Sequence, residues 1–141
     1  VTDPLIPGLK RADTLEELVE DNDIVSIHIP HKPETEKLFN EEIFSKFKQG
    51  AFLINTSRGE LIDFSALLKS LQNKVLAGAA LDVLEGEYEE GFSENISVHP
   101  LLEYARKHDN LIITPHIGGS TCDAWRLTEE FTLRKVIEAL E

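Results

Sequence analysis

The stretch Ala51-Phe-Leu-Ile-Asn-Thr-Ser-Arg-Gly59 decides the fold, because a short apolar run ends abruptly in polar residues and a glycine. Apolar runs of this length, bounded by turn residues, are typical of strands in a parallel sheet. Residues 23–29, 75–82 and 110–114 form three further runs of this kind. The sequence therefore predicts four strands, with residues 23–29 as a buried one.

Amphipathic helical patterns alternate with these strands. Thr14 and Glu17 form a capping box that predicts a helix through residue 21, and Asn40 and Asp63 are expected to cap the next two. A short helix is expected at residues 100–105 and a longer one after Ser120. The acidic connection at residues 85–95 is long for a loop between a strand and a helix in such a fold. The alternation predicts an α/β fold built on a parallel sheet.

Composition excludes several classes of function. A length of 141 residues suits one domain or part of one, and a net charge of -12 argues against nucleic acid or an anionic membrane as a partner. No apolar run is long enough to span a bilayer. The single cysteine, Cys122, has no disulfide or metal-ligand companion, so we expect no metal site and a reducing, cytoplasmic location.

Ligands of open parallel sheets bind beyond the carboxyl ends of the strands, so the polar residues at those ends are the candidate site. Arg58 stands directly after a strand and before Gly59. A guanidinium there suits a planar carboxylate, which accepts two parallel hydrogen bonds from it. The alternative is an ordinary ion pair between Arg58 and a surface acid.

His116 follows the last predicted strand and precedes Ile117 and two glycines. Imidazole is a natural proton donor or acceptor for an alcohol-to-ketone interconversion near neutral pH, although a structural histidine is the simpler alternative. A neighbouring carboxylate would orient the ring, and Glu87 is the candidate. Other acids of the same loop, or none of them, remain open as alternatives.

At this point the sequence resembles the D-isomer-specific 2-hydroxy-acid dehydrogenases, a family with phosphoglycerate, lactate and glycerate members. Residues 24–30, 33–35, 52–59 and 61–63 look like the family signature, and residues 81–83 and 114–120 match two further blocks in the right order. The resemblance implies an NAD-dependent oxidoreductase acting on a small 2-hydroxy or 2-keto acid. It assigns Arg58 to substrate binding, His116 to proton transfer and Glu87 to the partner of His116. Most members have proline after that glutamate, whereas Tyr88 follows it here.

The resemblance also implies residues that bind NAD. Asp3 corresponds to the acid that binds the adenosine ribose, although an Asp-Pro turn is the alternative. Asp82 corresponds to the acid that holds the nicotinamide amide. The expected cofactor-binding residues are Asp3, Ile29, Pro30, Thr56, Ser57, Arg58, Asp82, His116, Gly118 and Gly119. NAD rather than NADP is expected, and the particular acid that is the substrate stays open.

The Gly-x-Gly-x-x-Gly turn that cradles the cofactor pyrophosphate does not occur in the 141 residues. We therefore expect residues 1–141 to be an incomplete NAD-binding domain: a partial Rossmann-type parallel sheet with flanking helices that lacks its first strands. The substrate domain is expected elsewhere in a homodimeric parent enzyme, and the isolated chain is expected to be inactive.

The same resemblance leaves an alternative open, a corepressor-like protein that senses NAD.

With the strand order 3-2-1-4-5-6, the absent strands would separate residues 23–29 from the other three strands. That gap predicts rearrangement, a loosely attached first unit, or non-native association through strand edges.

Overall fold

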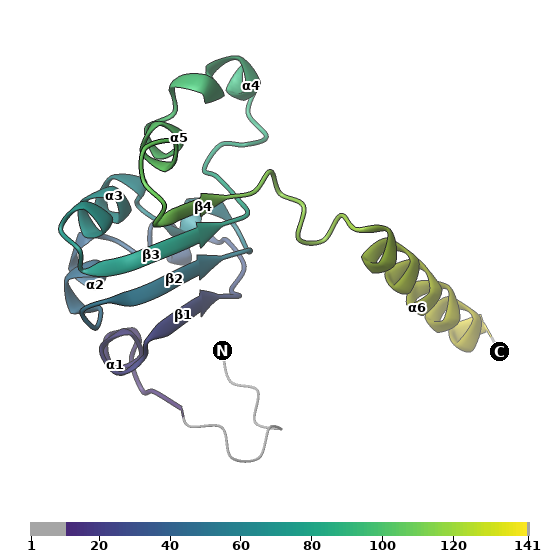
Figure 1. Cartoon of the computed structure of the whole chain (residues 1–141). Coiled ribbons are helices and arrows are strands. Elements are labelled where there is room, and N and C mark those ends of the chain that lie inside the picture. The colour runs from purple at the N-terminus through teal and green to yellow at the C-terminus, as the bar shows by residue number, and fades with distance from the viewer. Residues whose placement is uncertain (1–10, 141) are drawn as a thin grey trace.

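The computed structural model describes residues 11–140, in which four parallel strands form one sheet in the order β1-β2-β3-β4. The strands are β1 (Ile24–Ile27), β2 (Ala51–Asn55), β3 (Leu76–Leu81) and β4 (Leu111–Ile113). Figure 1 shows them side by side with their arrowheads, the carboxyl ends, along one edge. The four predicted strands are therefore confirmed, with β1 ending two residues earlier than expected.

Helices connect the strands as the capping residues predict. They are α1 (Leu15–Asp21), α2 (Glu41–Lys46), α3 (Phe64–Gln72), α4 (Phe92–Asn95), α5 (Pro100–Ala105) and α6 (Cys122–Leu140). The side chains of Thr14, Asn40 and Asp63 each accept a backbone N–H at the start of α1, α2 and α3. Short 3-10 turns at Pro33–Thr35, Gly59–Leu61 and Ile96–Val98 were not predicted.

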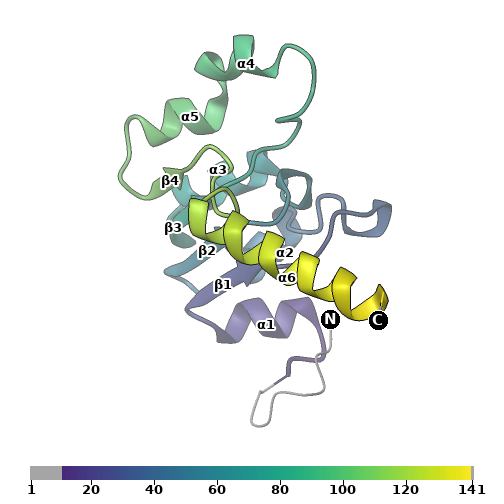
Figure 2. The same cartoon turned by 90° about the vertical axis from the view of Figure 1, so that its right-hand side faces the viewer.

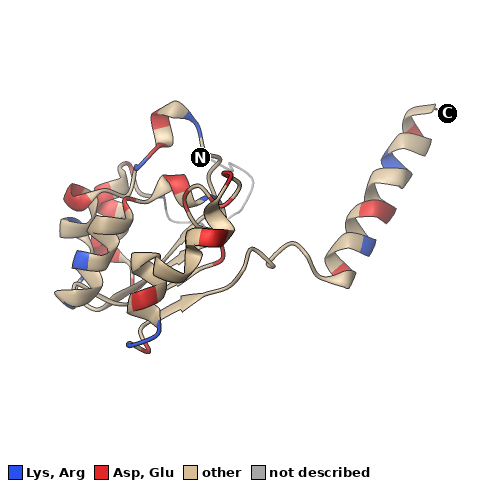
Figure 3. Cartoon of the chain, turned by 90° about the horizontal axis from the view of Figure 1, so that it is seen from above, with Lys and Arg blue, Asp and Glu red and all other residues tan. Residues whose placement is uncertain are grey.

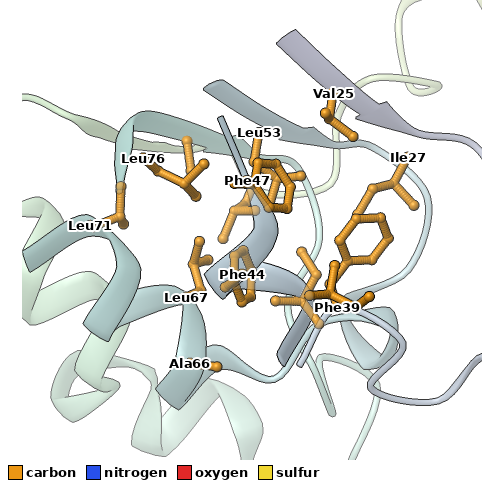
Figure 4. Close-up of a cluster of buried hydrophobic side chains, with 14 of the residues drawn as sticks. Val25, Ile27, Phe39, Phe44, Phe47, Leu53, Ala66, Leu67, Leu71 and Leu76 are labelled. Atoms are coloured by element: carbon orange, nitrogen blue, oxygen red, sulfur yellow. The ribbon is translucent and has the colours of Figure 1, made fainter. Parts of the chain in front are cut away.

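The main core lies between the sheet and the helices on one of its faces. Phe39, Phe44, Phe47, Leu67 and Leu71 pack there against Val25, Ile27, Leu53 and Leu76 from the strands (Figure 4). All of these side chains are at most 5% exposed. Burial of this set fixes the helices against the sheet and thereby fixes where the strand ends lie.

The opposite face of the sheet is apolar, and within residues 11–140 it is left open. Burial alternates along β1, and the outward-pointing Ile24, Phe52 and Ile112 are 61%, 49% and 61% exposed. The prediction of a buried strand at residues 23–29 is therefore wrong for the described residues: β1 is covered on one face only.

The predicted gap in the sheet is also wrong. β1 pairs directly with β2 in parallel register, with Ile24 opposite Phe52 and Ile27 opposite Asn55. The expected gap followed from taking β1 as strand 3 of the order 3-2-1-4-5-6, in which two absent strands would separate it from β2. In the structure β1 lies next to β2. The four strands form one uninterrupted sheet, and the expected association of chains through strand edges stays a prediction.

Helix α6 projects from the sheet beyond the segment at residues 114–121 (Figure 1), and in the view turned by 90° it lies in front of the strands (Figure 2). None of its residues is buried, and Trp125 and Phe131 are each 62% exposed. Acidic and basic side chains are interspersed along it, whereas acidic side chains dominate the rest of the molecule (Figure 3). No helix within residues 11–140 is long and apolar enough to cross a membrane.

Candidate active site

The carboxyl end of β2 is shaped by a buried amide side chain. Asn55 is fully buried, its Nδ2 donates to the carbonyl of Arg58 at 2.8 Å, and its Oδ1 accepts from the N–H of Ser57 at 2.9 Å. The hydroxyl of Ser57 in turn donates to the carbonyl of Ile29 beyond β1. These bonds fix the turn that presents Arg58. Sequence reasoning missed Asn55, although it is the one polar residue in an apolar strand.

Arg58 lies at the rim of an open hollow beyond β1 and β2. The hollow has a volume of about 620 Å³ and is also lined by Pro30, Ser57 and Tyr88. The guanidinium donates to the Ser57 carbonyl at 2.6 Å, and none of the ion pairs described within residues 11–140 includes it. The exposed cation is therefore available to an anion in this hollow.

His116 and Glu87 come together 29 residues apart in the chain. The Nδ1 atom of His116 lies 2.5 Å from Oε1 of Glu87, and the two side chains are 32% and 14% exposed. Oε2 of Glu87 accepts the N–H of Leu84 at 3.1 Å, which holds the carboxylate in place. An ionised carboxylate only accepts hydrogen bonds, so this contact fixes a proton on Nδ1 of the ring.

The loop that carries His116 is anchored by Asp82. The carboxylate is 6% exposed and accepts from Thr114 Oγ1 at 2.5 Å, from Ile117 N at 2.9 Å and from Gly118 N at 2.7 Å. His116 itself has a φ of 52°, a left-handed conformation that is uncommon for a side chain other than glycine. Bonds to residues on both sides of His116 stabilise this backbone conformation.

The same contacts decide the charge of Asp82. Burial raises the pKa of this carboxyl, but hydrogen bonds from Thr114, Gly118 and Ile117 together with positive charge on His116 outweigh it. The pKa of Asp82 is therefore below its usual value, and the group is a carboxylate at neutral pH.

A second pocket, of about 520 Å³, lies beside His116. Glu87, Tyr88 and His116 line one part of it, and Phe92 and Leu102 contribute apolar lining. Tyr88 lines this pocket as well as the hollow at Arg58, so the two spaces are neighbours at one edge of the sheet. Three separate segments of the chain thus bring arginine, carboxylate and imidazole to that edge.

The remaining predicted cofactor-binding residues are Thr56, Gly118, Gly119 and Asp3. Thr56, Gly118 and Gly119 are exposed at the same edge. A Cβ on Gly118 would lie 2.8 Å from Oδ2 of Asp82, which explains glycine there. Asp3 lies outside the described residues, so its role stays a prediction. Residues 11–140 contain no group of three or more His, Cys, Asp or Glu side chains that could hold a metal ion.

Residues 7–118 match the family model described as "D-isomer specific 2-hydroxyacid dehydrogenase, NAD binding domain". The chain belongs to this dehydrogenase family. Among its relatives, a glyoxylate reductase of Thermofilum pendens is 42% identical over 137 residues, which are 97% of this chain and 37% of that protein. A D-3-phosphoglycerate dehydrogenase of Haemophilus influenzae is 45% identical over 115 residues, covering 82% of this chain and 27% of that protein.

Solved dehydrogenase structures agree with the fold. A D-lactate dehydrogenase of Lactobacillus jensenii with NAD+ gives a TM-score of 0.76 at 31% identity, over 88% of this chain and 38% of that one. A D-lactate dehydrogenase of Aquifex aeolicus, complexed with NAD and lactic acid, gives 0.72 at 35% identity over 94% and 44%. The α/β Rossmann-type fold and the NAD-binding character of the domain are thereby confirmed. The chain spans well under half the length of the relatives it matches.

Proposed function

We propose that the protein containing this chain is an NAD-dependent D-2-hydroxy acid dehydrogenase, and that residues 1–141 are an incomplete NAD-binding domain within it. The parent enzyme is expected to be a homodimer with a separate substrate domain. Arg58, Glu87 and His116 are its proposed catalytic residues. The observation that carries the proposal is the contact of 2.5 Å between Nδ1 of His116 and Glu87, at the sheet edge that also presents Arg58.

The pair is suited to moving a proton to or from a substrate oxygen. With Nδ1 occupied by Glu87, Nε2 is the ring nitrogen left for substrate. A protonated Nε2 donates to the carbonyl oxygen of a 2-keto acid during reduction, and a bare Nε2 accepts the hydroxyl proton during oxidation. The carboxylate of Glu87 stabilises the imidazolium form that alternates with the neutral one.

Arg58 is proposed to bind the carboxylate of the substrate. Its guanidinium is exposed in a hollow that adjoins the pocket of His116 through Tyr88. Two parallel hydrogen bonds to a carboxylate would fix the orientation of the acid and hold its carbonyl towards His116. This arrangement supports a 2-keto acid, whose carboxylate and carbonyl groups are adjacent.

The residues present fit the nicotinamide end of NAD. Ile29, Pro30 and Ser57 line the hollow at Arg58. NAD, when bound, supplies or accepts the hydride. The chain has no Gly-x-Gly-x-x-Gly turn for the pyrophosphate, so the isolated 141 residues are expected to show no turnover.

The test is a comparison of NADH oxidation by the intact parent protein and its His116→Gln variant over a panel of 2-keto acids. We expect the variant to lose about a thousandfold in kcat or more on the acid that the wild type prefers, because general acid–base catalysis contributes on this scale. A wild-type rate no higher than that of the variant on every acid would refute the enzyme and favour the NAD-sensing alternative.

A further inference from the structure

Tyr88 replaces the proline expected after the catalytic glutamate, and the proposed reaction does not use it. Its hydroxyl lies 3.0 Å from Nδ1 of His116, the same nitrogen that contacts Glu87. The rings of Tyr88 and His116 are also close, with centroids 5.9 Å apart. Tyr88 is 78% exposed, so core packing does not account for its position.

With Glu87 ionised, one arrangement of protons satisfies both contacts at Nδ1. If Nδ1 were bare, its lone pair would face the carboxylate of Glu87 at 2.5 Å, which is repulsive. With the proton on Nδ1, Glu87 accepts the short bond and the Tyr88 oxygen accepts the longer part of a three-centre bond. Glu87 selects this tautomer, the Tyr88 hydroxyl joins the same proton as a second acceptor, and Nε2 is left free.

We propose that Tyr88 is a positioning residue, which shares Nδ1 of His116 with Glu87 and so holds the imidazole with Nε2 towards the substrate. This inference rests on the proposed function. Tyr88 lines both the hollow at Arg58 and the pocket at His116. It therefore restrains the imidazole of His116 on the side that faces Arg58, where the substrate carboxylate is proposed to bind. A proline at this position would have no hydroxyl to do so.

The activity test uses the Tyr88→Phe variant of the intact protein, which keeps the aromatic ring and removes only the hydroxyl. We expect kcat to fall about three- to tenfold with KM within about twofold, the size of one ordinary hydrogen bond. Tyr104→Phe is the matched control, since Tyr104 is the only other tyrosine and stacks on His108 instead. An unchanged kcat in Tyr88→Phe would overturn the proposal.

Nitrogen-15 NMR of the intact protein, labelled at histidine, gives a readout that does not depend on activity. We expect the neutral His116 ring to carry its proton on Nδ1, and the Nδ1 resonance to move in Tyr88→Phe but not in Tyr104→Phe. An Nδ1 resonance of His116 that does not move in Tyr88→Phe overturns the proposal. A responsive resonance in a protein that reduces no 2-keto acid supports the Tyr88 contact and refutes the proposed function, which separates the two failures.

Discussion

Asp82 illustrates how one side chain sets the geometry of a whole loop. Its carboxylate accepts three hydrogen bonds from the segment that carries His116, and it is almost completely buried. The resemblance assigns this residue to the nicotinamide amide, which stays a prediction. The structure adds that Asp82 holds the loop that carries His116. Sequence alone could not reveal this, because Asp82 and Ile117 are 35 residues apart.

Replacing Asp82 by asparagine should therefore loosen the His116 loop. The amide group of asparagine would turn a donor towards a backbone N–H, so we expect a loss of about 2 kcal/mol in unfolding free energy at neutral pH. Asp23→Asn is the control, because Asp23 is exposed and its ion pair with Lys48 contributes little. Urea denaturation measures both variants, and equal stabilities would contradict the anchoring role.

The low pKa of Asp82 also predicts the sign of a pH effect. A carboxyl whose pKa is lower in the folded than in the unfolded chain stabilises the fold above the unfolded value, and this stabilisation is lost as pH falls through the folded value. We expect the stability difference between wild type and Asp82→Asn to shrink below about pH 4. A difference that grows with acid would contradict this assignment.

At the scale of single elements, capping residues and strand patterns predicted most of the structure. Thr14, Asn40 and Asp63 cap the helices that they were expected to cap, since N-cap bonding is local. The burial of each strand face was not predictable, because it depends on which elements cover the sheet. The acidic connection at residues 85–95 was predicted only to be long, yet it ends in the helix α4, and a 3-10 turn follows it at Ile96–Val98.

Gly59, which follows Arg58, lies against the backbone of the segment that leads to Glu87. A Cβ at this position would lie 2.1 Å from the carbonyl carbon of Leu84 and 2.2 Å from the nitrogen of Glu85, so backbone must move to admit it. We expect Gly59→Ala to cost about 3 kcal/mol in thermal or urea unfolding and to displace the segment that leads to Glu87. Gly119→Ala meets nothing within 4 Å and serves as the control. Equal stability of the two variants would show that the segments do not touch.

His99 connects the stability of α5 to pH. Its Nδ1 accepts the N–H of Leu101 at 3.3 Å, and burial lowers its pKa although Glu85 opposes the shift. The neutral ring is therefore favoured on folding, and its stabilisation is complete above the unfolded pKa and lost as pH falls through the folded one.

We expect the wild type to lose more stability than His99→Asn between about pH 7.5 and about pH 5.5, because asparagine caps a helix without titrating. At the lower pH the free energy of unfolding of the wild type should be about 1 kcal/mol below that of His99→Asn, measured by urea denaturation. Identical pH dependence would exclude His99 as the titrating cap.

For the molecule as a whole, the sequence predicted the α/β class and the residues at the sheet edge, because strand ends in parallel sheets share one edge. It did not predict that β1 adjoins β2, since strand order follows from long-range pairing rather than local pattern. The residues alone gave Glu87 as a candidate with the other acids of its loop left open, and the family resemblance chose it. Its position 2.5 Å from His116 supports that choice. Tyr88 was noted only as a departure, and its contact needed coordinates.

The central claim is that Glu87 and His116, from separate segments, act as one unit in proton transfer. A double-mutant cycle on kcat in the intact protein, with Glu87→Gln, His116→Gln and both together, tests it most directly. We expect the double variant to be no slower than His116→Gln alone, because Glu87 acts only through the ring of His116. A double variant that is slower than the wild type by the product of the two single losses would contradict it, because the two residues would then act independently.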